Sequence, residues 1–514
     1  MPPDHVCEYI WRCFAPFRDG QFLQYRIPTL PGPDPASSPN GYIVNRTIPL
    51  VLAVALFMEQ MDSTVIATAL PAIAADIQTS PISLKLALTA YLVSLAIFIP
   101  ISGWMADRFG ARRIFAIAIG VFLVGSIACA ASGSLLEFVL SRFLQGMGGA
   151  MMTPVGRLVL LRSTEKSQLV SAMAWLTIPA LVGPMVGPPV GGFLTTFLSW
   201  HWIFLINIPI GLAGIVFALK ILPDDGIRQR AKVDWLGFLL SGGAASGIVF
   251  GLSVISLPVL PPVWGIAATI GGVLSLIGYL AHARSHPRPL LDPKLFRNRT
   301  FALALLGASL FRVGAGAVPF LLPLMLQLGF GMSPFQSGMI TFISAAGAIM
   351  MKFIIKRILS FGGFRATLLV AAAGATISIA INGFFSPATP IALMLIILFC
   401  GGLVRSMFFT SVNALTFSEI SPENAAQASS ITSAFQQVAI AVGVALAGGI
   451  VEVVSSLNGG ELSLGAFHSA FFIVAAITAL AIFPFLALPP DAGDAVSGHS
   501  LKQAGGRAAS PVRS

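Results

Sequence analysis

The stretch FMEQMDSTVIATALP, from Phe57 to Pro71, places two carboxylic acids inside an apolar run that is long enough to cross a lipid bilayer. An Asp at the centre of a membrane helix costs about 2.5–3.5 kcal/mol on insertion scales, so such acids are rarely kept without a function. Glu59 and Asp62 are three positions apart and share one face of a helix, with Gln60 beside them. We expect this face to line a polar cavity that the rest of the chain closes and gates.

The composition of the whole chain indicates a membrane protein. Of its 514 residues, 56% are hydrophobic and only 10% are charged, and the mean hydropathy is +0.87. A soluble domain carries about 25% charged residues. The apolar runs are unbroken over about 20 residues, which is typical of membrane helices and not of the alternating strands of an outer-membrane barrel. The sequence therefore predicts an all-α polytopic membrane protein.

Fourteen candidate spans follow one another in a pattern of six, two and six, because polar basic connections set a middle pair apart. Two six-helix bundles around a central path are typical of transporters built from repeats. The expected spans are 48–74, 85–106, 112–132, 135–161, 168–198, 202–222, 234–256, 262–283, 300–324, 335–358, 364–385, 388–418, 426–455 and 466–488. The expected domains are a disordered cytoplasmic tail (1–45), an N-terminal six-helix bundle (46–222), two inserted helices with flanking cytoplasmic loops (223–299), a C-terminal six-helix bundle (300–488) and a second cytoplasmic tail (489–514).

The distribution of basic residues predicts the orientation. Loops rich in Lys and Arg stay in the cytoplasm, and the opposite loops carry only Lys85. Both termini are therefore expected to be cytoplasmic, and the low cysteine and high alanine content indicates a bacterial inner (plasma) membrane. The residues on the basic side are Arg108, Arg112, Arg113, Arg162, Lys166, Arg228, Arg230, Lys232, Arg284, Arg288, Lys294, Arg297, Arg299, Lys356, Arg357 and Arg365.

The net charge of +10 does not indicate a nucleic-acid partner. The basic residues lie in short loops, where insertion topology and anionic lipid headgroups account for them. The six histidines form no catalytic constellation, so we expect no enzyme, no metal site and no cofactor other than protons as the coupling ion. His282 and His286 are interpreted as a solvated loop end rather than as metal ligands.

The motif GWMADRFGARR, from Gly103 to Arg113, joins the second and third spans. Gly103 and Gly110 would permit a tight turn and a close approach of two backbones. At the membrane surface, an ion-pair cluster would form from Asp107, Arg108, Arg112 and Arg113. The alternative is that these arginines only anchor the loop in the cytoplasm.

This motif resembles the cytoplasmic signature of the major facilitator superfamily, G-x-L-A-D-R-x-G-R-R. Met105 replaces the Leu and Ala111 replaces the first of the two final Arg, so one partner of the family's charge network is missing. The resemblance implies a fold of two six-helix bundles, here with two extra central helices. It also implies a conformational role for Gly103, Asp107, Arg108, Gly110, Arg112 and Arg113.

The fourth span contains LSRFLQGMGGAMMTP, with Arg142, Gln145 and Gly146 in the positions of the superfamily's R-x-x-Q-G motif. The resemblance implies a role in proton coupling for Arg142. The alternative is that Arg142, about two turns from the outer end of its span, only extends its side chain to the membrane surface.

The fifth span reads ALVGPMVGPPVGGFL and combines helix-bending prolines with small residues that allow close packing. We expect a gate or seal between the bundles here. Its core resembles the G-P-x-x-G-G motif of proton-coupled exporters in the same superfamily, which favours efflux over uptake. The expected gating residues are Gly187, Pro188, Gly191 and Gly192.

Two further segments resemble the fourteen-helix drug:proton antiporter branch. WHWIFLINIPIG, from Trp200 to Gly211, is similar to its W-R-W-x-F-x-x-N-x-P-x-G signature, with His201 in place of Arg. MDSTVIATALP is similar to L-D-x-T-x-x-N-x-A-L-P, with Ala67 in place of Asn. The resemblance implies a proton-coupled exporter of small amphiphilic compounds or drugs and gives Asp62 a coupling role. We expect it to function as a monomer, although the sequence does not indicate the oligomeric state. Asp62→Asn is expected to stop proton-driven efflux while the protein still inserts.

In the second half, Arg312 and Arg405 lie deep in predicted spans. Unpaired Arg is costly at that depth, so each is expected to face water or a partner. We predict that Glu59 or Asp62 meets one of them across the cavity in some conformation, with Gln60 as a further lining residue. The alternatives are an uptake permease or an exporter of one specific metabolite on the same fold, and a sensor that does not transport. The sequence does not indicate the substrate, the proton stoichiometry or a periplasmic adaptor.

Overall fold

A computed structural model describes residues 47–164, 168–224, 233–255, 257, 261–287, 289–459, 462–493 and 496. Those residues form helices and their connections and contain no strand, and they belong to one compact unit, Asn45–Ser514. The predicted tail 1–45, and most of the predicted tail 489–514, lie outside the described residues. The all-α class is confirmed.

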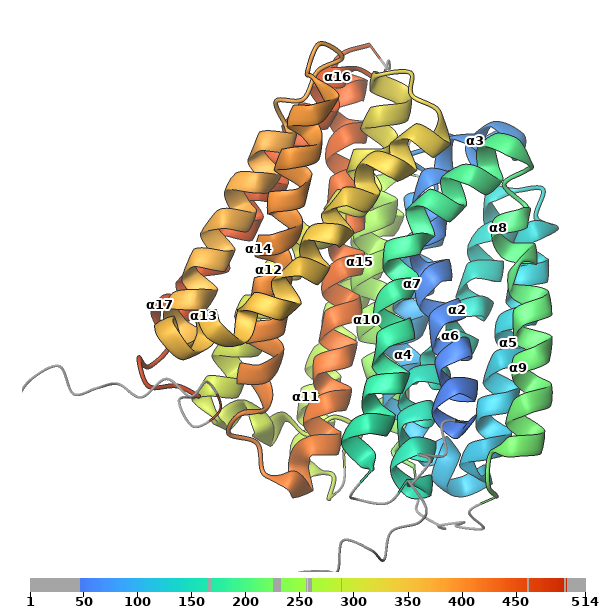
Figure 1. Ribbon diagram of the computed structural model, residues 1–514, viewed down its shortest axis with the longest axis vertical. Helices are drawn as coiled ribbons and strands as arrows, with labels where there is room; N and C mark the ends of the chain where they lie inside the picture. The colour runs from blue at the N-terminus through green and yellow to red at the C-terminus, as the bar shows by residue number, and fades with distance from the viewer. Residues whose placement is uncertain are drawn as a thin grey trace, which may run out of the picture. The chain divides into compact units, whose positions relative to one another are not determined.

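The helices follow one another in the order shown in Figure 1. The first half contains α2 (Thr47–Val65), η2 (Ile66–Thr68), α3 (Leu70–Asp76), α4 (Lys85–Phe109), α5 (Ala111–Ala130), α6 (Leu135–Ser163), α7 (Leu169–Phe197), α8 (Trp202–Leu205) and α9 (Asn207–Ile221). The middle pair is α10 (Trp235–Ile255) and α11 (Pro262–Ser285). The second half contains η3 (Pro293–Arg297), α12 (Arg299–Leu324), the π-helix η4 (Met325–Gly329), α13 (Pro334–Asn382), α14 (Ile391–Phe417), η5 (Pro422–Asn424), α15 (Ala425–Leu457), α16 (Leu464–Ala479) and α17 (Ile482–Leu486).

Within the described residues, 11 helical stretches are long and apolar enough to cross a membrane, which confirms a multi-pass protein. One of them, α13, holds two predicted spans: its helix is broken only at Gly363, where φ is +62°. Glycine adopts this left-handed conformation without the cost that a side chain would add. The exact number of fourteen spans and the domain boundaries stay predictions.

Local sequence signals account for several helix ends. The Ser134 side chain accepts a hydrogen bond from the Glu137 amide at the start of α6, and Ser333 and Gln336 form a capping box at the start of α13. At the end of α4, Gly110 has a φ of +92° and turns the chain directly into α5. The tight turn expected at Gly110 is therefore present.

The first predicted span is shorter than expected. The helix α2 ends at Val65, and a 3₁₀ turn precedes α3 instead of a continuous helix to residue 74. Pro71 explains the break, because its nitrogen cannot donate to the carbonyl four residues earlier. The interruption leaves the Thr68 carbonyl free to accept a hydrogen bond from Gln327 Nε2, 3.1 Å away in the second half.

We call the helix ends near Thr68, Leu84, Thr196 and Pro334 the arginine-poor end, and the opposite ends, near Arg112, the arginine-rich end. In Figure 1, α3 and the start of α16 lie together at the arginine-poor end. The rule that basic loops face the cytoplasm predicts that the arginine-rich end is cytoplasmic.

The two halves share a hydrophobic core at the arginine-poor end. There, Ile66 and Leu70 belong to the same buried cluster as Phe320, Leu324 and Phe471. Two other large clusters each draw on one half only, one from Val51 to Leu222 and one from Ala304 to Ala492. The halves are thus joined at one end, while their main cores elsewhere stay separate.

The middle pair packs beside the seam between the halves. The two helices α10 and α11 pack against each other, and α10 also contacts α4 from the first half and α15 from the second. Lys85 is buried at the start of α4, not in a loop, and lies against α15 near Gly448. The helices α4 and α15 therefore form a long contact between the halves.

Candidate functional site

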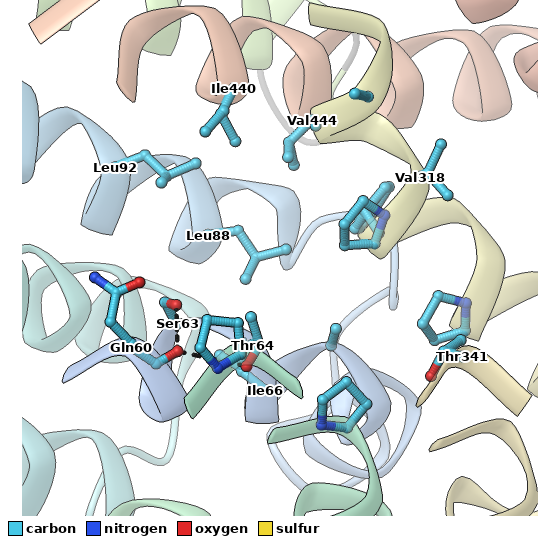
Figure 2. Close-up of a pocket in the computed structure, with 18 of the residues that line it drawn as sticks. Gln60, Ser63, Thr64, Ile66, Leu88, Leu92, Val318, Thr341, Ile440 and Val444 are labelled. Carbon is cyan, nitrogen blue, oxygen red and sulfur yellow. Dashed lines mark hydrogen bonds between the residues drawn. The ribbon is translucent and has the colours of Figure 1, made fainter. Parts of the chain in front are cut away.

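A cavity of about 460 Å³ lies between the two halves and is lined by residues of α2, α4, α6, α7, α12, α13, α14 and α15. In Figure 2, Gln60 and Ser63 of α2 lie below the aliphatic side chains of Leu88 on α4 and Ile440 on α15. One face of the cavity is thus polar and another is apolar. Six predicted site residues are in the lining: Glu59, Gln60, Arg142, Pro188, Arg312 and Arg405.

Glu59 reaches the cavity although its side chain is only 4% exposed. Its carboxyl group accepts a hydrogen bond from Gln60 Nε2 at 2.6 Å and another from the Tyr91 hydroxyl at 3.3 Å. Both donors are neutral, and neither compensates a full negative charge. Glu59 is therefore an acid without a basic partner among the described residues, placed where a proton or a substrate can reach it.

Asp62 is placed differently. It is completely buried, does not line the cavity, and forms an ion pair with Arg142, with 2.8 Å between Oδ2 and Nη1. Its Oδ1 accepts hydrogen bonds from Gln145 Nε2 and Asn207 Nδ2, both at 2.8 Å. Three donors, one of them charged, thus surround this carboxyl group. In this conformation, neither Asp62 nor Glu59 contacts Arg312 or Arg405, so the predicted pairing across the cavity stays a prediction for another conformation.

Arg142 does not extend toward the membrane surface, because its side chain is 1% exposed. The guanidinium donates to Asp62 and to Gln145 Oε1, and its carbon lies 4.3 Å from the centre of the Tyr91 ring. A buried charge is tolerated when it is both paired and hydrogen-bonded. The first half therefore neutralises its own buried arginine.

Four residues of this cluster have no predicted role: Tyr91, Ser126, Gln145 and Asn207. Ser126 on α5 accepts hydrogen bonds from Gln145 and Asn207, at 2.8 and 3.3 Å. Gln145 and Asn207 stand in quoted motifs, and an amide inside an apolar span is itself a signal of a buried polar network. Tyr91 and Ser126 give no such signal, because isolated hydroxyl groups are common in membrane helices.

Several predicted contacts of the basic motif are wrong in this conformation. Asp107 pairs with Arg162 at 2.6 Å and Arg112 with Asp224 at 3.1 Å, so no ion-pair cluster forms within the motif. The partners come from outside the motif: Arg162 lies in the last turn of α6, and Asp224 lies just beyond the end of α9. Within the described part of the chain, Arg108 and Arg113 make no ion pair.

Gly103 also differs from its prediction. It is an exposed residue within α4, and a Cβ added there would meet nothing within 4 Å. The expected close backbone approach is absent at this position. The conformational role that the motif implies for Gly103 is therefore not supported by any contact in this conformation.

The glycines of α7 allow this helix to pack closely against two neighbouring helices. A Cβ on Gly183 would lie 2.9 Å from the Phe57 carbonyl oxygen, and Gly187 and Gly191 face α2 in the same way one and two turns further on. A Cβ on Gly192 would lie 2.5 Å from the Pro334 carbonyl oxygen at the start of α13. The Pro188 carbonyl in turn lies against Gly338 of α13. The helix α7 therefore contacts α2 in its own half and α13 in the other.

In the second half, Arg312 and Arg405 have only neutral partners. Arg312 is 2% exposed and donates from Nη2 to Asn413 Oδ1 at 3.3 Å. Arg405 donates from Nη2 to Ser344 Oγ at 2.8 Å. Among the described residues, neither arginine forms an ion pair. Both side chains line the cavity.

A second polar cluster lies at the arginine-rich end, outside the cavity. His282 Nε2 is 2.7 Å from Asp234 Oδ1, and both side chains are largely buried, so the interpretation of His282 as a solvated loop end is wrong. Ligand atoms of Asp234, His282 and His286 lie within 4.8 Å of one another and could hold a metal ion. However, Asp234 already accepts hydrogen bonds from the amides of Gly237 and Leu290. Burial alone would raise the pKa of Asp234, but these amides and His282 outweigh it and hold that pKa below its usual value.

Comparisons with known proteins agree with this architecture. The sequence profile of the Major Facilitator Superfamily matches residues 52–444 and 304–511. A protein of Enterobacter sp. (strain 638), provisionally named multidrug resistance protein MdtD, is 35% identical over 458 residues, which cover 86% of this chain and 94% of that protein. Its counterpart in Citrobacter koseri is 36% identical over 451 residues, with the same coverage.

Solved structures show the same fold at low sequence identity. The nucleoside transporter NupG superimposes with a TM-score of 0.61 at 17% identity, covering 86% of this chain and 98% of that one. A D-xylose–proton symporter gives a TM-score of 0.62 at 14% identity, covering 87% and 98%.

Proposed function

The chain belongs to the major facilitator superfamily of membrane transporters, and we propose that it exports small amphiphilic compounds in exchange for protons. It is a multi-pass transporter and not an enzyme. The name of its bacterial relatives, at 35–36% identity, supports multidrug efflux at the bacterial inner membrane. The G-P-x-x-G-G segment of α7 supports efflux over uptake.

The observation that carries the proposal is the difference between the two acids of α2. Glu59 lines the cavity with neutral partners, whereas Asp62 is buried against Arg142. A carboxyl group exchanges protons most readily where no fixed positive charge holds it ionised. Glu59 is therefore the proton carrier of the cycle, and Asp62 and Arg142 form the fixed charge pair that positions α2 against α6.

Alternating access requires the halves to separate where they are now joined. In this conformation, the shared core at the arginine-poor end and the contact of Gly192 with Pro334 close the cavity on that side. With the arginine-rich end in the cytoplasm, the closed side faces the periplasm. Release of substrate then requires this core to open while the arginine-rich end closes, as the two halves rock around the cavity.

Proton entry supplies the driving force. One elementary charge that crosses the membrane is worth about 2.3 kcal/mol per 100 mV. When a compound enters from the cytoplasm, Glu59 releases its proton there, and it takes up a new one from the periplasmic side. One proton per cycle at 100 mV therefore supports about a fiftyfold accumulation of an uncharged compound. Each protein copy contains a complete cavity, so a monomer suffices for this cycle.

The test uses inside-out membrane vesicles with an acidic interior and a pH-sensitive dye inside. A transported compound should alkalinise the interior, because each molecule that enters the vesicle releases a proton from it. A panel of amphiphilic cations and anions identifies which compounds act. Empty-vector vesicles serve as the control. Acidification of the interior, caused by compounds that enter the vesicle together with protons, would instead identify a proton symporter and hence an uptake permease.

A further inference from the structure

Two arginines of the second half, the buried Arg312 and the partly buried Arg405, line the cavity and contact no carboxylate among the described residues. Arg312 on α12 contacts Asn413 and lies with its guanidinium carbon 5.2 Å from the centre of the Phe409 ring. Arg405 on α14 contacts Ser344. A guanidinium has five N–H donors in a planar fork that matches a carboxylate. Among the described residues, each of these arginines gives one hydrogen bond to the protein, so most of its donors stay available to a ligand.

The charges around the cavity do not balance. Its lining carries Glu59 against three arginines, and Asp62, behind the lining, neutralises Arg142. One negative and two positive charges remain when Glu59 is ionised, and only the two positive charges remain when Glu59 is protonated. Away from bulk water, such an excess strongly favours an anion over a cation.

The rest of the cavity is suited to an apolar body. Leu88 and Leu92 on α4 and Ile440 and Val444 on α15 face the space between the halves (Figure 2). A pocket of about 460 Å³ falls in the range that holds one drug-sized molecule. The cavity therefore has aliphatic side chains on one side and the positively charged side chains of Arg312 and Arg405, both from the second half, on another.

Building on the proposed function, we propose that the transported compounds are anionic amphiphiles whose carboxylate or sulfonate binds Arg312 and Arg405. Glu59, on α2, lies in the other half of the cavity wall. Because an anion that leaves and a proton that enters move charge in the same direction, an interior-negative membrane potential assists export.

The test measures binding to the purified full-length protein in nanodiscs, without any gradient, by isothermal titration calorimetry. The probes are 1-naphthaleneacetate and 1-naphthylmethylammonium, which share an apolar body and carry opposite charges. The anion should bind the wild-type protein at least tenfold more tightly than the cation. Arg312→Gln and Arg405→Gln should each weaken anion binding at least tenfold and leave cation binding unchanged or stronger.

The matched control is Lys352→Gln. Lys352 lies on α13 in the same half, donates to Thr410 at 2.7 Å and does not line the cavity, so its loss should not change anion binding. Arg312→Lys keeps the positive charge but lacks the planar set of N–H donors of a guanidinium. It should still prefer the anion over the cation, with a reduced affinity for the anion. Thermal unfolding of each variant confirms that it is folded.

The proposal is overturned if the cation binds as tightly as the anion, or if both arginine variants bind the anion like the wild-type protein. Its failure is distinguishable from failure of the proposed function. Arginine-dependent anion binding without proton-driven transport would reject proton exchange and keep this inference. Proton-driven export of cations that is unchanged in both arginine variants would reject the anion-binding inference and keep the proposed proton exchange.

Discussion

The two halves of the protein treat buried arginine in opposite ways. In the first half, Arg142 is neutralised by Asp62, and the pair is enclosed by Gln145, Asn207 and Tyr91. In the second half, the buried Arg312 and the partly buried Arg405 meet only neutral groups among the described residues. The first half therefore balances the positive charge of Arg142 with a carboxylate of its own. The second half leaves positive charge at the cavity, where a mobile charge can compensate it.

Breaking the charge pair of the first half should have the largest effect on stability. Asp62→Asn leaves Arg142 buried without a counter-charge, so we expect the free energy of unfolding to fall by about 3–5 kcal/mol. Denaturant unfolding of the purified protein in detergent measures this loss. The expectation from sequence, that Asp62→Asn stops proton-driven efflux while the protein still inserts, stays a prediction.

The double variant Asp62→Asn with Arg142→Gln controls for the charge. It removes both members of the pair, so it should be more stable than Asp62→Asn alone. An unfolding free energy for Asp62→Asn equal to that of the wild-type protein would contradict the pairing.

The same comparison between the halves can be made by removing one arginine from each half and measuring the free energy of unfolding. Arg142→Gln should lower the free energy of unfolding by about 3–5 kcal/mol, because Asp62 is left buried and unpaired. Arg312→Gln removes a charge that has no counter-charge, so stability should not fall and should rise by up to about 3 kcal/mol. The same denaturant unfolding compares the two variants side by side. Equal losses in both would show that Arg312 has an internal counter-charge after all.

The contact that joins the halves offers a smaller perturbation. Gly192→Ala places a Cβ 2.5 Å from the Pro334 carbonyl oxygen, and overpacking of this kind costs about 1–3 kcal/mol. We expect the arginine-poor end to open more often. A cysteine introduced at Thr196 in a cysteine-free background should then react faster with a maleimide that cannot cross the membrane.

Gly103→Ala is the matched control, because an added Cβ there meets nothing within 4 Å. The labelling rate at position 196 should not change in this variant. Equal rates in Gly192→Ala and the wild-type protein would mean that the contact between α7 and α13 does not hold the halves closed.

The smallest expected effect lies at Asp234, outside the cavity. The pKa of this group is lowered in the folded protein, so its stabilising contribution is present above the unfolded value of about 3.9 and is lost as the pH falls through the lower, folded pKa. Asp234→Asn should cost about 1–2 kcal/mol at pH 7. It should also flatten the loss of stability below about pH 4, as measured by thermal unfolding. A variant that is as stable as the wild-type protein at pH 7 would contradict a structural role for the Asp234–His282 contact.

The sequence predicts the all-helical, multi-pass class correctly because long apolar runs between basic loops leave few alternatives. Its errors occur where a three-dimensional partner decides the outcome. Pro71 ends the first helix early, and the side chains of Asp107 and Arg112 find partners on α6 and α9 rather than within their own motif. Spacing along one helix cannot indicate which neighbouring helix supplies such a partner.

The same limit applies to the cavity. Depth and helical phase place Glu59 and Asp62 on one face, and both do lie on one side of α2. Only the packing of α2 against α6 and α9 separates them, because it buries Asp62 against Arg142 and leaves Glu59 at the cavity. The sequence motif pointed to Asp62, whereas the surroundings favour Glu59 as the group that exchanges protons.

The most direct test of this account compares exchange with accumulation in proteoliposomes that contain the Glu59→Gln variant. The amide cannot carry a proton, so exchange of labelled for unlabelled substrate without a gradient should continue. Accumulation against a concentration difference under an imposed pH gradient should fall to the level of empty liposomes. Accumulation by Glu59→Gln that equals the wild-type level would contradict the assignment of Glu59 as the proton carrier.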